Sequence, residues 1–157
     1  MTRRPRNLLP DGMFHVIARA AFDQALFCDD EDRRVFLWQL RRLAARFSFD
    51  LFAYCLMGTH YHLLLEGRAA GLPAVMGRLN GGYAQHFNAR HGRHGHLFSE
   101  RYAARPVLDE RHLEELWRYI EANPVKAGLC RPGQGWRWMW LKPLAASSGQ
   151  AGGLSHR

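Results

Sequence analysis

The segment from Phe49 to Glu66 places the strongest constraint on how this chain can fold. Two runs rich in apolar and aromatic residues, 49–57 and 60–66, are separated by Gly58 and Thr59. This pattern predicts two antiparallel strands joined by a tight turn. Successive side chains of a strand point to opposite faces, so each strand must present one face to a hydrophobic core.

His60 and His62 leave the same face of the second strand, whereas Tyr61, Leu63 and Leu65 form the opposite, apolar face. Two imidazoles on one rigid strand are able to share one metal ion. The pair is equally compatible with one hydrogen-bonded, half-buried histidine and one exposed histidine. A metal site therefore requires a further ligand from another part of the chain.

The periodicity of the remaining sequence predicts alternating strands and helices. The expected elements are a strand over Met13 to Arg19, a helix capped at Asp29-Asp30, the two strands above, a helix over about 74–90, a strand over Leu97 to Leu108 and a helix from Asp109 to about Asn123-Pro124. This order is typical of an α+β fold, a ferredoxin-like antiparallel sheet with packed helices and one added C-terminal helix.

Two polar residues lie one turn apart on the flank of that last helix. They are Tyr119 and Asn123. Because Pro124 disfavours helical structure at the residue before it, we expect Asn123 at the helix end, where its amide can reach a ligand. Taken singly, Tyr119 also fits an ordinary half-buried aromatic residue, and Asn123 fits a helix-terminating cap.

The size of the chain, 157 residues, fits one domain, which we place at 7–142, followed by a disordered tail at 143–157 with few apolar residues. Three widely spaced cysteines indicate neither a disulfide framework nor a zinc ribbon. No apolar run reaches the length of a membrane-spanning helix. We therefore expect a cytoplasmic protein with no membrane partner.

The net charge is +8, and arginine supplies every basic residue except Lys126 and Lys142. Such an excess favours a polyanionic partner, with nucleic acid as the natural candidate, although it also fits a preference for arginine that only keeps the protein soluble. The candidate DNA-binding residues are Arg3, Arg4, Arg6, Arg90, Arg93, Arg101, Arg105 and Lys126.

Four segments resemble one family at matching order and spacing. They are YCLMGTHYHLLLE (54–66), LNGGYAQHFN (79–88), GHLFSERY (95–102) and RYIEANPVKAG (118–128). Together they resemble the single-tyrosine HUH transposases, and within that group the REP-associated tyrosine transposases. The resemblance extends from about Asn7 to Trp140.

The resemblance implies that His60, His62 and Asn123 bind a divalent metal, Mg²⁺ or Mn²⁺, and that Tyr119 is the nucleophile. Imidazole ligands by themselves suit Mn²⁺ or Zn²⁺ better than Mg²⁺. Members of the family cut single-stranded DNA beside hairpins of palindromic repeats and become joined to a 5′ phosphate. Some act as monomers, and others share the tyrosine helix across a homodimer.

Two other functions fit parts of this pattern. The first is a noncatalytic protein that binds DNA hairpins, although such a protein has no need of a nucleophile. The second is an RNA-binding ferredoxin-like domain, which requires exposed aromatic residues on the sheet face that the histidines occupy.

The chain departs from the family pattern in two segments. Residues 20–23 stand where relatives carry an Arg-Gly-Asn-like turn, which weakens any assignment of a DNA contact there. The Trp136–Trp140 segment is expected to pack the end of the domain onto the sheet, with stacking on unpaired bases as the alternative.

Overall fold

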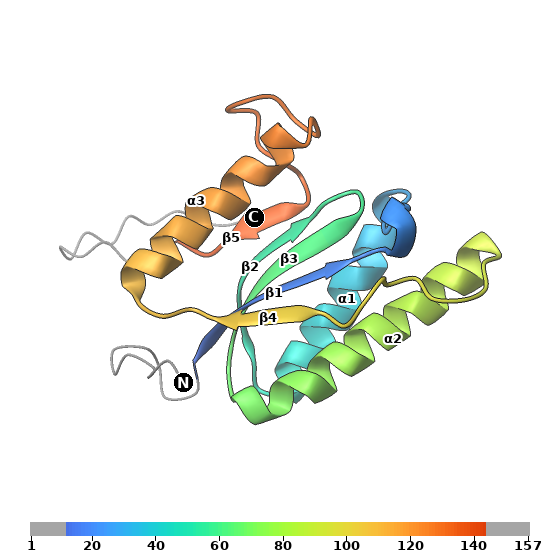
Figure 1. Ribbon diagram of the computed structural model, residues 1–157, viewed down its shortest axis with the longest axis horizontal. Coiled ribbons are helices and arrows are strands. Elements are labelled where there is room, and N and C mark those ends of the chain that lie inside the picture. Colours follow the sequence, from blue (N-terminus) through green and yellow to red (C-terminus); the bar gives the residue numbers. More distant parts are fainter. Residues whose placement is uncertain (1–11, 144–157) are drawn as a thin grey trace.

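The computed structural model describes residues 12–143 and contains a five-stranded antiparallel sheet (Figure 1). The strands are β1 (Met13–Arg19), β2 (Asp50–Leu56), β3 (His60–Glu66), β4 (Ala103–Pro106) and β5 (Met139–Leu141), in the spatial order β4-β1-β3-β2-β5. The helices are α1 (Asp30–Arg46), α2 (Leu72–His91) and α3 (Glu110–Lys126), with 3-10 turns at Ala21–Asp23 and Ala69–Gly71. The predicted α+β fold with a ferredoxin-like sheet is confirmed.

The ends of the chain bear on three predictions. Arg3, Arg4, Arg6 and the predicted domain start at residue 7 lie outside the described residues, as does almost all of the predicted tail. Within residues 12–143, none of the helices combines the length and apolarity needed to span a bilayer.

Helices cover both faces of the sheet. Figure 1 shows α1 and α2 against one face and α3 against the other. On the first face, Tyr61 and Leu63 of β3 belong to the same buried cluster as Phe36 of α1 and Tyr83 of α2. The Tyr61 hydroxyl donates a 2.6 Å hydrogen bond to Asn80 Oδ1, which fixes α2 on the central strand. The apolar face predicted for β3 is thus the main core.

The second face has a smaller core, beneath α3. Leu64 of β3 is fully buried there in one cluster with Ile120 of α3 and with Ala53 and Cys55 of β2. His60 and His62 share this face with Leu64, because alternate residues of β3 point the same way. The side chain of His62 therefore lies beneath α3, in contact with Asn123.

Two helices, α1 and α3, begin directly after the aspartates that the sequence predicts as caps. The Asp29 side chain accepts a hydrogen bond from the Asp32 N–H at 3.1 Å, and that of Asp109 accepts one from the His112 N–H at 2.8 Å. Both are N-caps that satisfy otherwise unpaired N–H groups. The C-terminal end of α2 is capped by Gly92, whose φ of 61° lies in the left-handed region that glycine adopts without strain.

The prediction of one strand over 97–108 was wrong, because the observed strand is shorter. Only Ala103–Pro106 pair continuously with β1, and Phe98 forms an isolated bridge with Ala20. From Ile17 to Ala20 the first strand advances three residues, whereas its partner segment uses five, from Phe98 to Ala103. The extra residues cannot be accommodated in the ladder, so the chain bends outward before β4 begins.

The predicted end of the last helix was also wrong. The α3 helix continues through Pro124 to Lys126, so Asn123 lies inside its last turn. Proline removes one helical hydrogen bond, but Pro124 is buried and its carbonyl accepts a 2.9 Å bond from Leu129 N–H. Burial and the downstream bonds offset the lost bond, and Asn123 still faces the sheet.

The Trp136–Trp140 segment packs the end of the domain onto the sheet, as expected. Trp136 Nε1 donates to the Leu56 carbonyl at 2.9 Å, and Trp138 Nε1 donates to Asp30 Oδ1 at 2.9 Å. Trp140 lies in β5, opposite Tyr54 of β2. That short fifth strand was not predicted.

Shortening the side chain of Leu64 should destabilise the protein. Leu64→Ala is expected to lower the free energy of unfolding by about 2–5 kcal/mol, because it leaves a cavity between β3 and α3. Leu108→Ala, at a partly exposed position, should change it by less than about 0.5 kcal/mol. Urea unfolding followed by circular dichroism measures both, and equal effects would contradict the proposed core under α3.

Candidate functional site

The site is built on β3, where it lies between two other strands. His62 is paired across the sheet with Ile17 of β1 on one side and with Cys55 of β2 on the other. Only 1% of its surface is exposed, whereas His60, at the start of the strand, is half-buried. The two imidazole rings lie 5.1 Å apart between centroids. The central strand therefore holds both histidines in fixed positions.

A third histidine, His15 of β1, joins this pair. Its Nε2 lies 3.0 Å from His62 Nδ1, and the two rings stack with centroids 5.3 Å apart. One of the two nitrogens must donate the shared proton, and when His62 Nδ1 donates it, His62 Nε2 presents a free lone pair toward α3. His15 thus orients the His62 ring.

Sequence reasoning missed His15, although a signal was present. In the strand Met13–Arg19, His15 alternates with Phe14 and Val16 of the core, so it must face the side that carries His60 and His62. His15 stands out there because its neighbours on the same face, Met13 and Ile17, are apolar. Its distance from the other histidines in sequence, 47 residues from His62, concealed the connection.

The α3 helix supplies the two remaining side chains. Asn123 Nδ2 lies 3.3 Å from His62 Nε2. The Tyr119 ring, one turn earlier, meets the His62 ring edge to face, with centroids 5.8 Å apart. Tyr119 is 45% exposed, so part of this residue is accessible from solvent. The structure brings His60, His62, Tyr119 and Asn123 of a single chain together.

A surface hollow of about 440 Å³ adjoins Tyr119. It is lined by His15, Ile17, Ala103, Arg105, His112, Leu116 and Tyr119. Arg105 of β4 is paired with His15 in the sheet and supplies the positive charge of this hollow. His112 Nδ1 already accepts a 3.0 Å hydrogen bond from Leu108 N–H, which holds the start of α3. A phosphate group next to Tyr119 would therefore meet a guanidinium.

The other residues predicted to bind DNA lie elsewhere. Arg101 lies in the bend before β4, and Lys126 lies in the last turn of α3. Arg90 lies in the last turn of α2 and Arg93 follows the helix, and α2 covers the face of the sheet opposite to α3. Arg90 is held by two carboxylates, whereas Arg93 donates to Asn88 Oδ1 at 3.3 Å. Of the predicted DNA-binding residues within 12–143, only Arg105 lines the hollow beside Tyr119.

Burial keeps all three histidines neutral at pH 7. It lowers the pKa of His60 to about 4, with Arg19 as a second cause, and that of His62 to about 3, assisted by His15 and His60. Burial also lowers the pKa of His15 to about 4, assisted by Arg105 and His112. Neutral imidazoles keep the lone pairs that a metal ion requires.

The donor set fits a divalent metal ion. His60 and His62 offer neutral imidazole nitrogens, and Asn123 offers a carboxamide whose oxygen and nitrogen exchange places by a simple flip. The His15–His62 contact is the kind of outer hydrogen bond that orients a ligating imidazole. An ion held by these three side chains would keep further coordination positions for substrate and water.

Comparison with known proteins identifies the family. The sequence profile described as "Transposase IS200 like" matches residues 10–123. The chain belongs to the IS200-like transposase family. None of the curated proteins compared is significantly similar in sequence. The family assignment makes this a transposase-like, DNA-processing protein.

Two solved structures share the fold of this IS200-like transposase. One is a REP-associated tyrosine transposase bound to a REP hairpin, with a TM-score of 0.61 and 14% identity, covering 88% of this chain and 82% of that one. The other is a candidate transposase from Deinococcus radiodurans R1, with a TM-score of 0.53 and 19% identity, covering 76% of this chain and 95% of that one.

The free energy of unfolding should fall as the pH is lowered from 7 to 5 in the presence of a chelator. In the unfolded chain the histidines take up protons near their ordinary pKa of 6.5, whereas the folded ones stay neutral until about pH 4 or below. The unfolded state therefore binds more protons in this range, and stability present above pH 6.5 is lost toward pH 4.

The size of this loss should be about 2 kcal/mol or more, measured by urea unfolding at several pH values. His15→Gln keeps a polar side chain but removes one buried imidazole. Its unfolding free energy should therefore depend less steeply on pH. An identical dependence in the variant would show that the buried His15 does not contribute.

Proposed function

We propose that this protein is a metal-dependent, single-stranded DNA endonuclease and strand transferase that cuts beside DNA hairpins, with Tyr119 as its nucleophile. The observation that carries the proposal is the position of Tyr119, exposed at the rim of the hollow and in ring contact with His62. The similar fold of a REP-associated tyrosine transposase bound to a REP hairpin supports a hairpin substrate.

The chemistry follows from the nature of the nucleophile. A neutral phenol is a poor nucleophile, so it needs an activated phosphorus and a stabilised leaving oxygen. A divalent ion held by His60, His62 and Asn123 would supply that Lewis-acid activation. Mn²⁺ or Mg²⁺ is the proposed ion.

Tyr119 and Arg105 carry out the remaining steps of the proposed cleavage. Tyr119 Oη forms a bond to phosphorus as the bond to the 3′ oxygen breaks, and the phenolic proton passes to solvent while the 3′ oxygen gains a proton. Arg105, across the hollow from Tyr119, is positioned to neutralise phosphate charge. The product is a 5′-phosphotyrosine and a free 3′ hydroxyl. Because one phosphate ester replaces another, a 3′ hydroxyl can reverse the reaction and join strands.

The site is assembled within one chain. His62, Tyr119 and Asn123 of the same molecule are in contact, so we propose that a monomer can carry out the cleavage step. Arg101 and Lys126, together with Arg3, Arg4 and Arg6, are proposed to bind the DNA backbone. This part of the binding should weaken with salt.

Tyr119→Phe should abolish the covalent product. With labelled hairpin DNA and Mn²⁺, the wild type should form an adduct that survives denaturing electrophoresis, and the variant should form ~10³-fold less or none, because it lacks the attacking oxygen. Tyr102→Phe, at another partly exposed tyrosine outside the hollow, is the matched control and should retain the adduct. A wild type that binds hairpins in a salt-sensitive way without any adduct would instead be a noncatalytic hairpin-binding protein.

Asn123→Ala should raise the Mn²⁺ concentration required for half-maximal adduct formation by roughly 10-fold or more, because one proposed ligand is lost. Glu121→Ala, an exposed position on the same helix, should leave that concentration unchanged. A titration of adduct yield against Mn²⁺ at fixed DNA concentration measures both. Equal midpoints for Asn123→Ala and the wild type would exclude Asn123 as a ligand.

A further inference from the structure

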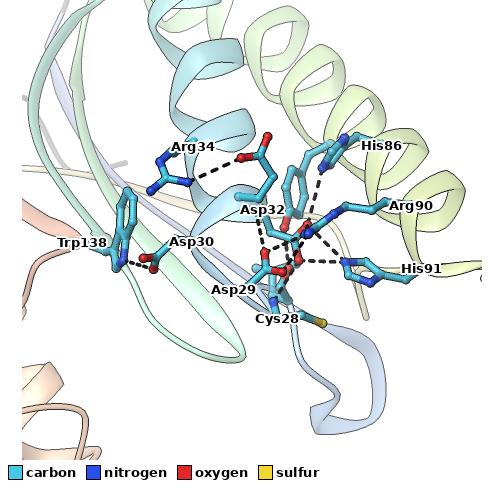
Figure 2. A network of polar contacts seen from close by, with 12 residues as sticks. Cys28, Asp29, Asp30, Asp32, Arg34, His86, Arg90, His91 and Trp138 are labelled. Carbon is cyan, nitrogen blue, oxygen red and sulfur yellow. Dashed lines mark hydrogen bonds and ion pairs between the residues drawn. The ribbon is translucent and has the colours of Figure 1, made fainter.

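A second cluster of metal-binding side chains lies on the other side of the sheet, between the start of α1 and the end of α2 (Figure 2). Among residues 12–143, Cys28, Asp32 and His91 are the group of three whose ligand atoms all lie within 4.8 Å of one another. We propose that these three residues form a second metal site, specific for Zn²⁺ or a similar transition metal. This site is independent of the proposed DNA cleavage.

Buried negative charge is the first argument for a cation. Asp32 is fully buried, and Asp29 lies beside it; Arg90 forms ion pairs with both carboxylates, and the buried Arg33 interacts electrostatically with them. Burial alone would raise the pKa of Asp32, yet hydrogen bonds from the Cys28 N–H, Arg90 and His91 lower it overall. Asp32 is therefore ionised in the fold, and a buried carboxylate next to a thiol and an imidazole is able to bind a metal cation.

Of the two Asp32 oxygens, Oδ2 is the closer to the other proposed ligands. Oδ1 accepts a 2.8 Å bond from Arg90 and lies 3.1 Å from His91 Nε2, whereas Oδ2 lies 2.9 Å from His91 Nε2 and also accepts from the Cys28 N–H at 2.9 Å. Arg90 additionally binds both oxygens of Asp29, at 2.6 and 2.8 Å. Arg90 can therefore stay in place and orient Asp32 while Oδ2 binds a metal.

An unsatisfied nitrogen is the second argument. His86, one turn before Arg90 on α2, has a buried Nε2 without a hydrogen-bond partner, 3.5 Å from Asp32 Oδ1. The 3.5 Å contact with Asp32 is within ion-pair distance but makes no hydrogen bond, so this nitrogen is poorly satisfied. Water would take the fourth position of a tetrahedral ion, because His86 does not belong to the group whose ligand atoms all lie within 4.8 Å of one another.

The chemistry of the donors selects the metal. A thiolate, an imidazole and one carboxylate form a typical zinc donor set, whereas Mg²⁺ and Ca²⁺ require oxygen ligands. Binding would release the Cys28 thiol proton to solvent, and the charges of Zn²⁺, the thiolate and Asp32 would then sum to zero. The ion would join α1 to α2, the two helices that cover the main core.

Co²⁺ binding to the full-length protein tests this proposal. Co²⁺ replaces Zn²⁺ and gives a thiolate-to-metal absorption band in the near ultraviolet only when a cysteine is a ligand. We expect this band in the wild type and in Cys130→Ser, a control at another free cysteine, and its loss in Cys28→Ser. His91→Gln should weaken Co²⁺ binding at least 10-fold. Absence of the band, or its persistence in Cys28→Ser, would overturn the proposal and leave His91 as a charged partner of Asp32.

Thermal unfolding gives an independent measurement. Zn²⁺ at about 100 times its dissociation constant should raise the melting temperature by roughly 5–10 °C in the wild type and in Cys130→Ser. Cys28→Ser should show a smaller rise than Cys130→Ser, with the remainder due to Zn²⁺ at the histidine site, and it should still form the Tyr119 adduct. Equal shifts with and without Cys28 would contradict the site. A loss of adduct in Tyr119→Phe has no bearing on it, so the two proposals fail separately.

Discussion

Burial of β3 on both faces is the constraint on which the rest of this structure depends. The strand is hydrogen-bonded to β1 and β2, while α1 and α2 cover one face and α3 the other. Because β3 cannot shift by one residue without exchanging its two faces, the pairing also fixes where His60 and His62 point. One face of β3 thus packs into the main core, and the other face carries the polar site.

The same burial determines the chemistry of the site. An imidazole enclosed by a sheet and a helix loses the hydration that favours its charged form, so His15 and His62 remain neutral at pH 7. Their mutual hydrogen bond satisfies the nitrogen that does not face α3. The other ring nitrogen of His62, Nε2, lies beside Asn123 and stays available for coordination.

The helix layer on the opposite face has its own polar centre at Asp32. A fully buried carboxylate requires compensating partners, and the end of α2 supplies Arg90 and His91. This contact joins residues 58 or more positions apart in sequence. Arg90 lies in a sequence that is rich in arginine and histidine and therefore resembles a nucleic-acid contact, yet its guanidinium is used within the fold. Composition does not distinguish the two uses, because both depend on the same charge.

The sequence by itself determined the order of elements, the bounds of β1 and β3, the caps Asp29 and Asp109, and the family. These features depend on local periodicity, capping and motif spacing, all of which can be read along the chain. The length of β4, the passage of α3 through Pro124 and the addition of β5 were not predictable in this way. Each depends on hydrogen bonds or packing with a distant segment.

The candidate site likewise has a part that the sequence predicts and a part that only the tertiary structure shows. Its four predicted residues were visible in the sequence, because His60 and His62 are neighbours on a strand and Tyr119 and Asn123 are neighbours on a helix. Only the tertiary structure decided that the strand and the helix face each other within one chain, and that His15 joins them. The physical reason is that the pairing of β1 with β3 and the packing of α3 on Leu64 set those distances, and both involve residues far apart in sequence.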